Sequence, residues 1–359
     1  MTRIEEPTTN TADPARIEAF AAQTVDRLAS AWTIAAIHVG DRLGLYPALT
    51  EGAGTADDIA ARASTNPRLT REWLDGQVAA GIVELDATGR YTLPLEHAAV
   101  LAVDDSPAFL AGAGGVLAAV LQAEDQITKA FRGDGRLAWG DQAPCLFGAV
   151  DRFYRTGYAA SLVDDWIPSL ARAVRDLDDG GRVADVGCGR GTALVMMAEA
   201  FPSATFVGID NHDASLTRAS ERIASSGLGS RVRLERATAA TFGNGPFDLI
   251  CFFDALHDMG DPSAAIRNAR AHLAPTGSVM LVEPAANEAV GDSVGDVAAQ
   301  LYYPGSAFLC TPNALAQGDT ALGNQVPEAT WRDLFTRADF SSFKRVAATP
   351  FNRVFEARI

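Results

Sequence analysis

Hydrophobic residues in the second half of the chain follow two alternating patterns. Short runs rich in Val, Ile, Leu and Phe, typical of buried strands, are separated by stretches in which apolar residues recur at helical spacing. Strands are predicted at 182–186, 205–210, 231–236, 247–253, 278–282, 343–348 and 353–357. Helices are predicted at 192–201, 214–225, 262–273 and 330–338. This alternation predicts an α/β fold with a mostly parallel seven-stranded sheet that ends in an antiparallel hairpin.

The first hundred residues show a different pattern. Helical spacing of apolar residues over 15–50 predicts two helices, apolar enough to pack against a partner subunit as well as a core. A short N-capped helix, a second helix over 66–81 and a hairpin over 82–93 come next. Helix, helix and hairpin make a winged helix, so we expect a mainly α-helical winged-helix domain over 16–105.

Two further segments are expected to shape a ligand site. Residues 106–178 read as a helical connector that covers the site, with Tyr154 and Tyr158 facing inward, and the sheet domain is expected over 179–359. Residues 287–324 read as a long loop that is too apolar for disorder and is placed to wall a substrate pocket. Its candidate lining residues are Tyr302, Tyr303 and Cys310.

Charge decides between two interpretations of the winged helix. The net charge of the whole chain is −15, and residues 1–105 hold eight Arg and no Lys against sixteen acidic residues, a net of −8. Proteins that bind nucleic acid draw affinity from Lys and Arg on phosphates. The sequence therefore predicts no nucleic-acid partner.

The remaining bulk features predict a cytoplasmic protein. Residues 1–15 are polar, lack the pattern of a signal peptide and are expected to be a disordered tail. No apolar run approaches the length of a membrane span, so no membrane partner is expected. Four widely spaced cysteines without a C-x-x-C pair indicate free thiols in a reducing compartment.

The turn after the first predicted strand of the sheet is a candidate nucleotide site. Glycines allow the backbone to approach a ligand closely, and here three of them alternate at Gly187, Gly189 and Gly191. Asp210 ends the next strand about twenty residues later, where a carboxylate can accept hydrogen bonds from a ribose diol. Asp185 precedes the turn, which makes it a poor neighbour for phosphate and a good one for an ammonium or sulfonium group.

A histidine follows the fourth predicted strand. Parallel strands place ligands at their carboxyl edge, and His257 lies four residues beyond this strand, in Leu-His-Asp-Met-Gly-Asp-Pro. Because imidazole titrates near neutrality, His257 can remove a proton from a hydroxyl group.

Both motifs resemble one family. The sequence from Val183 to Gly191 resembles motif I of class I S-adenosylmethionine (AdoMet)-dependent methyltransferases, which have a Rossmann-like sheet. Leu-His-Asp-Met-Gly-Asp resembles the Leu-His-Asp-Trp-Ser-Asp signature of small-molecule O-methyltransferases. The acidic winged helix is similar to their N-terminal dimerisation domain. From Ile34 onward the chain looks like a group of actinobacterial AdoMet methyltransferases whose substrates are unassigned.

The resemblance implies a cofactor and a set of residues that bind it. The cofactor is AdoMet, with S-adenosylhomocysteine (SAH) as product. Thr238 stands where the family commonly has an Asp near adenine, so adenine contacts are expected from a hydroxyl instead. The implied cofactor residues are Asp185, Gly187, Gly189, Gly191, Asp210, Asn211, Thr238, Ala239, Asp254 and Tyr158.

The resemblance also implies a mechanism and a partner. His257 corresponds to the general base and Glu283 to the acid that orients it, while Asp258 either helps to orient the base or caps the following helix. The N-terminal domain implies a homodimer that acts on a small molecule, at a hydroxyl oxygen.

Three alternatives remain open. Related keto-acid C-methyltransferases bind iron through a His-Asp pair and a later histidine, but no histidine follows His272, so no metal is expected. The protein can also methylate carbon or nitrogen, or use AdoMet without transferring methyl. It can instead be a transcriptional regulator that senses AdoMet. The sequence does not identify the methyl acceptor.

Overall fold

The structure of the protein is a computed structural model that describes residues 12–359. The chain divides into two compact units, Met1–Gly114 and Gly115–Ile359. Within the described residues, no helix is both long enough and apolar enough to cross a membrane.

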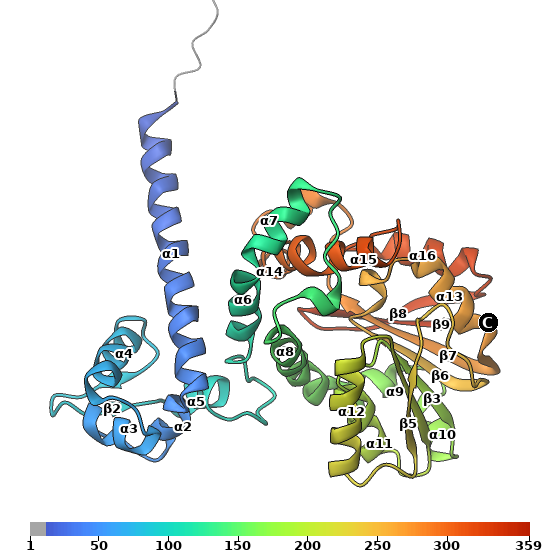
Figure 1. The fold of residues 1–359 in the computed structure, drawn as a ribbon, viewed down its shortest axis with the longest axis horizontal. Coiled ribbons are helices and arrows are strands. Elements are labelled where there is room, and N and C mark those ends of the chain that lie inside the picture. Colours follow the sequence, from blue (N-terminus) through green and yellow to red (C-terminus); the bar gives the residue numbers. More distant parts are fainter. Residues whose placement is uncertain (1–11) are drawn as a thin grey trace, which may run out of the picture. The chain divides into compact units, whose positions relative to one another are not determined.

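The first unit consists of helices and one short hairpin (Figure 1). Its elements are α1 (Pro14–Arg42), α2 (Leu45–Thr50), α3 (Ala56–Ala63), α4 (Pro67–Ala79), β1 (Glu84–Leu85), β2 (Tyr91–Thr92) and α5 (Leu95–Leu101). Thr55 and Asn66 cap α3 and α4 through their side chains, as the sequence indicates. The predicted winged helix is confirmed as α3, α4 and the β1–β2 hairpin.

The N-terminal helix differs in its bounds from the prediction. Asp13 accepts a hydrogen bond from the backbone N of Ala15, so the helix begins at Pro14 and the predicted tail ends earlier than expected. The rest of that tail, residues 1–11, lies outside the described residues. The expected division of residues 15–50 into two helices of similar length was wrong, because both apolar stretches, 17–28 and 32–39, lie in α1. The break falls at Gly44, whose φ of 69° ends the long helix before α2.

The second unit is built on a seven-stranded sheet of order β5-β4-β3-β6-β7-β9-β8. The first five strands in this order are parallel, and β9 runs antiparallel to both neighbours. The strands are β3 (Arg182–Val186), β4 (Thr205–Asp210), β5 (Val232–Arg236), β6 (Phe247–Phe253), β7 (Leu273–Pro284), β8 (Ser342–Ala348) and β9 (Asn352–Arg358). The predicted Rossmann-like sheet and its antiparallel end are confirmed.

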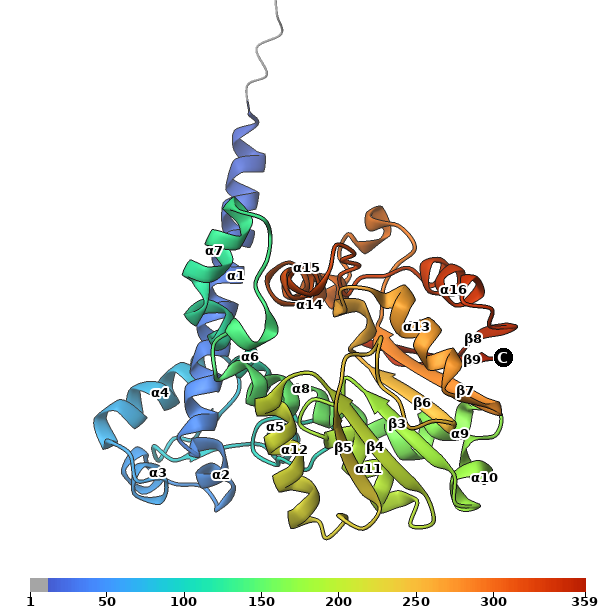
Figure 2. The ribbon, with the colours of Figure 1, turned by 45° about the vertical axis from the view of Figure 1, so that its right-hand side comes forward.

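Helices cover both faces of this sheet (Figure 2). They include α10 (Ala173–Asp178), α11 (Thr192–Ala200), α12 (Asp213–Ser225), α13 (Pro262–Ala271) and α16 (Glu328–Arg337). Leu194 of α11 lies in one apolar cluster with β3 and β4, and Phe335 of α16 lies in the cluster on the opposite face. Burial on both faces explains why the central strands are almost wholly apolar. Polar side chains therefore collect where the strands end.

The connector is more interrupted than the sequence indicates. Its first part consists of two separate helices, and a turn of π-helix interrupts the later segment. The elements are α6 (Ala113–Gln122), α7 (Glu124–Arg132), the 3-10 helix η1 (Trp139–Asp141), α8 (Leu146–Ser161), the π-helix η2 (Leu162–Trp166) and α9 (Ile167–Ser169).

The segment expected to be a loop over 287–324 is largely helical. It contains η4 (Val290–Ser293), α14 (Val297–Gly305), the π-helix η5 (Ser306–Cys310) and α15 (Thr311–Gln317). Asp296 caps α14 by accepting hydrogen bonds from two backbone N–H groups. Pro312 occupies the first turn of α15, where its missing N–H costs no hydrogen bond. The prediction of a loop was therefore wrong. Pro312 stands at a position that a helix tolerates, and Pro304 lies near the end of α14, shortly before the π-turn.

Candidate active site

The glycine turn and Asp210 form one rigid structure at the carboxyl edge of the sheet. Gly187 and Gly189 have φ values of 79° and 53°, in the left-handed region that favours glycine. A Cβ on Gly187 would lie 2.7 Å from the Cβ of Ala255. The backbone N of Gly189 donates to Asp210 Oδ2 at 2.8 Å, and the backbone N of His212 donates to Oδ1 at 2.8 Å. The acid at the end of β4 is thus fixed against the turn after β3.

Asp185 is a buried carboxyl group with an unsatisfied atom. Its side chain is 1% exposed, and Oδ1 has no hydrogen-bond partner. Burial, with the nearby carboxylate of Asp210, raises the pKa of Asp185 to about 8. Buried polar atoms in folded proteins are normally paired, so this oxygen is suited to a donor supplied by a ligand, such as an ammonium group.

A cavity of about 200 Å³ lies beside these two acids. Nine of the ten cofactor residues expected from the sequence line it, and Gly191 does not. Gly191 instead lies at the start of α11, where a Cβ would come within 3.2 Å of Ala219. The lining also contains residues that the sequence did not single out: Trp139, Phe147, Asp151, Arg190, Asn313 and Gln317.

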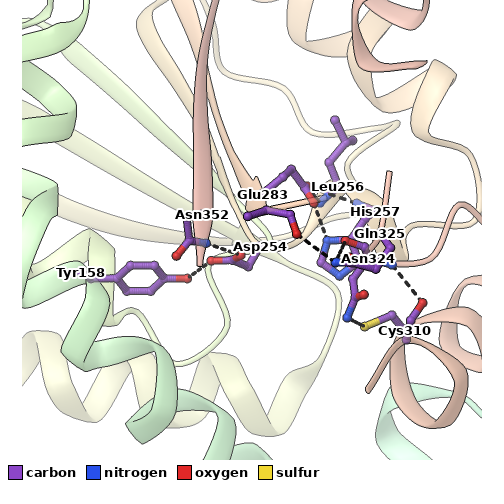
Figure 3. Close-up of polar contacts among 11 residues, drawn as sticks. Tyr158, Asp254, Leu256, His257, Glu283, Cys310, Asn324, Gln325 and Asn352 are labelled. Atoms are coloured by element: carbon purple, nitrogen blue, oxygen red, sulfur yellow. Dashed lines mark hydrogen bonds and ion pairs between the residues drawn. The ribbon is translucent and has the colours of Figure 1, made fainter. Parts of the chain in front are cut away.

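Asp254 connects the cavity to three other elements (Figure 3). It follows β6 with a φ of 49°, an unusual conformation for a residue other than glycine. Tyr158 Oη donates to its Oδ2 at 3.1 Å, and Asn352 Nδ2 donates to its Oδ1 at 2.9 Å. Burial, together with the Glu283 carboxylate, raises the pKa of Asp254 to about 8. The rings of Tyr154 and Tyr158 stack 6.0 Å apart on α8.

His257 and Glu283 form a buried pair. His257 lies on the 3-10 helix η3 (Leu256–Asp258) after β6, and Glu283 lies near the end of β7. His257 Nδ1 donates to Glu283 Oε2 at 2.5 Å, while Glu283 Oε1 accepts from the backbone N of Leu256 and of His257. Burial alone would lower the pKa of His257, but Glu283 and Cys310 outweigh it and hold that pKa well above its ordinary value. Glu283 does not contact Nε2, and the His257 ring also has a hydrogen bond with the side chain of Cys310.

Asp258 does not cap the following helix. The N-cap of α13 is Asp261, whose Oδ1 accepts from the backbone N of Ala264 at 2.8 Å. Asp258 lines the cavity instead, and burial raises its pKa to about 6 although His257 opposes the shift. The capping alternative was wrong because three residues further along the chain a second Asp stands directly before Pro262.

The candidate substrate residues lie in different surroundings. Tyr154 lines the cavity, whereas Tyr302, Tyr303 and Cys310 are absent from its lining. Tyr303 is 37% exposed, which argues against an inward role. Tyr302 is buried and Cys310 half-buried. Burial raises the pKa of the Tyr154 phenol, and the nearby Asp254, Tyr302 and Cys310 add to this shift. His257, Asp258 and Cys310 also place one ligand-type atom each within 4.8 Å of one another.

Comparison with known families identifies the class of both units. Residues 177–325 match the family model described as a methyltransferase domain, and residues 31–103 match the Rv2258c-like winged HTH domain. The chain therefore has a methyltransferase domain preceded by a winged helix-turn-helix domain.

Individual relatives match only parts of the chain. A trans-aconitate 2-methyltransferase from Variovorax paradoxus is 33% identical over 33% of this chain and 50% of its own length. A nocamycin O-methyltransferase from Saccharothrix syringae is 36% identical over 35% of this chain and 47% of its own length. This chain thus spans about half the length of the curated relatives that it matches.

Solved structures agree with the fold over nearly the whole chain. A structure titled PigF with SAH has a TM-score of 0.72 at 21% identity and covers 94% of this chain and 98% of its own. Human N-acetylserotonin methyltransferase in complex with SAM has a TM-score of 0.70 at 17% identity, covering 98% and 99% respectively. At these identities the likeness establishes the fold.

The Glu283–His257 pair predicts unequal effects of two substitutions. Glu283→Ala removes the acceptor of a buried imidazole and of two backbone N–H groups, so it should lower the free energy of unfolding by about 3–5 kcal/mol. Glu283→Gln keeps an amide oxygen for the backbone donors and should lower it less. Urea unfolding of the three proteins measures the difference. Equal losses below about 1 kcal/mol in both variants would contradict the described hydrogen bonds.

Proposed function

We propose that this protein is an AdoMet-dependent methyltransferase that methylates a hydroxyl oxygen of a small molecule, with His257 as the general base. The observation that carries the proposal is the buried His257–Glu283 pair, with its hydrogen bond of 2.5 Å, next to a cavity that begins at the glycine turn. The methyltransferase domain match supports the reaction class. The relatives named as O-methyltransferases support oxygen as the acceptor.

The cavity has the residues needed to bind AdoMet. The unpaired Oδ1 of Asp185 would accept a hydrogen bond from the amino group of the cofactor. Asp210, held by two backbone N–H groups, would accept hydrogen bonds from the ribose diol. Thr238 and Ala239 line the part of the cavity next to β5 and would contact adenine. When bound, AdoMet supplies a methyl group on a positively charged sulfur.

Glu283, His257 and Asp258 would then transfer the proton and orient the methyl acceptor. Glu283 accepts the hydrogen bond from Nδ1–H, so the neutral imidazole would carry its lone pair on Nε2. Nε2 would take the proton of the acceptor hydroxyl as the oxygen–methyl bond forms and the sulfur–methyl bond breaks. The imidazolium that results is stabilised by the Glu283 carboxylate. Asp258 would orient the acceptor from the cavity wall.

A second candidate function is transcriptional regulation through the winged helix-turn-helix domain. The net charge of −8 over residues 1–105 opposes this function, because a DNA-binding surface needs clustered positive charge. Methylation of carbon or nitrogen needs the same cofactor site and also releases a proton, so the paired histidine is compatible with all three acceptors. The relatives named as O-methyltransferases favour oxygen.

We also propose a homodimer that forms through the first unit. Helix α1 is 29 residues long and buries only Gly40, while Phe20, Leu28 and Trp32 are more than half exposed. An apolar stripe of this length is unusual on a monomer surface and is suited to a second copy of the chain.

Replacing His257 by Ala should lower kcat by about 10²–10⁴-fold, the contribution of a positioned base. The dissociation constant for SAH should change little, because His257 does not line the cofactor cavity. Labelled-AdoMet turnover and calorimetry measure the two quantities. His272→Ala is the matched control, since its side chain bonds to the backbone of α13. Unchanged turnover in His257→Ala would rule out the base assignment.

Binding of AdoMet should release a proton near pH 7. The pKa of Asp185 is raised to about 8, so its carboxyl group is mostly protonated in the free protein at pH 7. A bound ammonium group favours the carboxylate, so affinity should increase as pH rises from 6 to 8 and the proton should go to the buffer. Calorimetry in buffers of different ionisation enthalpy counts the proton. Asp185→Asn should remove this proton release; an unchanged count in that variant would contradict the role of Asp185.

Charged substitutions on α1 should dissociate the dimer. Leu28→Glu combined with Trp32→Glu places two buried charges at the proposed interface, so light scattering after gel filtration should show a monomer. Leu95→Glu on α5, at a position that is 85% exposed, is the control and should leave the dimer intact. A wild-type protein that is monomeric at micromolar concentration would contradict the proposal.

A further inference from the structure

Three side chains from distant parts of the sequence meet next to the cavity. His257 and Asp258 lie on η3 after β6, and Cys310 ends the π-helix η5. One nitrogen of His257, one carboxylate oxygen of Asp258 and the sulfur of Cys310 lie within 4.8 Å of one another. π-Turns within helices commonly mark functional positions, and here the turn brings Cys310 to the histidine. Figure 3 shows His257 and Cys310 near one another, with Asn324 beside Cys310.

The donor set selects a class of ligand. An imidazole nitrogen, a carboxylate oxygen and a thiolate sulfur together suit a borderline-soft divalent cation of the zinc type better than Mg²⁺ or Ca²⁺. Bond lengths of about 2.0–2.3 Å place the ligand atoms of a tetrahedral zinc site roughly 3.3–3.8 Å apart. The observed separations reach that geometry with side-chain movements of about 1 Å. Three protein ligands leave a fourth position open.

The residues around the cluster support the same ligand. Glu283 bonds Nδ1 of His257 and so directs Nε2 to the opposite side, the arrangement that carboxylates give to histidines at metal sites. Asn324 Nδ2 donates to Cys310 Sγ at 3.7 Å, which stabilises negative charge on sulfur. Asn313 Nδ2 donates to the backbone oxygen of Asp258 and ties α15 to η3.

One buried atom near the cluster has no partner. Asn324 is 4% exposed, and its Oδ1 makes no hydrogen bond. The amide nitrogen of the same side chain contacts Cys310 Sγ, so this oxygen belongs to an amide that lies next to Cys310. It can accept a hydrogen bond from a water molecule in the open position of a bound cation. Leaving such an oxygen unpaired costs about 1–3 kcal/mol, so a ligand that satisfies it is favoured.

We propose that His257, Asp258 and Cys310 form a binding site for Zn²⁺, and that its occupation reversibly inhibits the enzyme. On binding, the thiol loses its proton to solvent and Nε2 donates its lone pair to the metal. Nε2 is the atom that the proposed function requires to accept the proton of the acceptor hydroxyl. The cation and the methyl acceptor therefore compete for one nitrogen. The inhibition rests on the proposed function, whereas the metal site does not.

Cobalt tests the binding site directly. Co²⁺ replaces Zn²⁺ in sites of this type, and a cobalt–thiolate bond gives a near-ultraviolet charge-transfer band. Titration of the full-length, metal-free protein with Co²⁺ should produce this band at one equivalent, and Zn²⁺ should remove it. Cys310→Ser should abolish the band, and Asp258→Asn should weaken Co²⁺ affinity at least tenfold. Cys145→Ser, which changes the exposed cysteine, should leave the band unchanged.

A second arm tests inhibition. SAH formation is followed with a hydroxylated acceptor that the metal-free protein turns over, and each variant is compared with its own metal-free rate. Zn²⁺ should inhibit the wild type and Cys145→Ser, and at least a tenfold higher concentration should be needed for Cys310→Ser. Chelator should restore the rate.

The possible outcomes distinguish the proposed metal site from the proposed methyltransferase function. No cobalt band, or a band that persists in Cys310→Ser, overturns the metal site. A Cys310-dependent band together with stimulation by Zn²⁺ confirms the site but overturns both its inhibitory role and the role of His257 as base. A Cys310-dependent band without any methyl transfer supports the site and counts against the proposed function.

Discussion

The active-site region depends on the fact that parallel strands end on the same side of a sheet. Strands β4, β3, β6 and β7 are consecutive parallel strands of the sheet, so their carboxyl ends lie along one edge. Asp185 and Asp210 lie at the ends of β3 and β4, His257 follows β6, and Glu283 lies near the end of β7. Four polar side chains thus meet although they span a hundred residues of sequence. The apolar faces of the strands supply the burial that raises the pKa values of Asp185 and Asp210.

The carboxyl groups of Glu283 and Asp185 are both buried, but they differ in their hydrogen bonds. Glu283 is paired with His257 and with two backbone N–H groups, so its charge is compensated within the protein. Asp185 has an unpaired oxygen, and desolvation raises its pKa to about 8. A carboxylate with hydrogen-bond partners can orient a neighbouring residue, whereas a carboxyl oxygen without a partner can accept a hydrogen bond from a ligand. This difference in hydrogen bonding separates the part of the site that we propose for catalysis from the part that we propose for the cofactor.

Much of this arrangement could be predicted from the sequence, because it depends on short spacings. The glycine turn, Asp210 and the histidine after β6 each lie within a few residues of a strand end. Contacts between distant segments could not be predicted: Asn352 reaches Asp254 from β9, and Cys310 approaches His257 because η5 is a π-turn rather than part of a loop. Asp258 was ambiguous because Asp261 has the same capping chemistry nearby. Trp139 and Phe147 line the cavity from a connector whose fold has no local signal.

The central claim is that Nε2 of His257 faces the methyl group of AdoMet across the place of the acceptor oxygen. A crystal structure with SAH bound measures this most directly. An acceptor oxygen at near-attack distance from the methyl carbon and within hydrogen-bond reach of Nε2 requires the sulfur of SAH to lie roughly 6–8 Å from Nε2. The account predicts a separation in that range, with the amino group of SAH on Asp185. A sulfur atom directed away from His257, or separated from it by a protein side chain, would contradict the account.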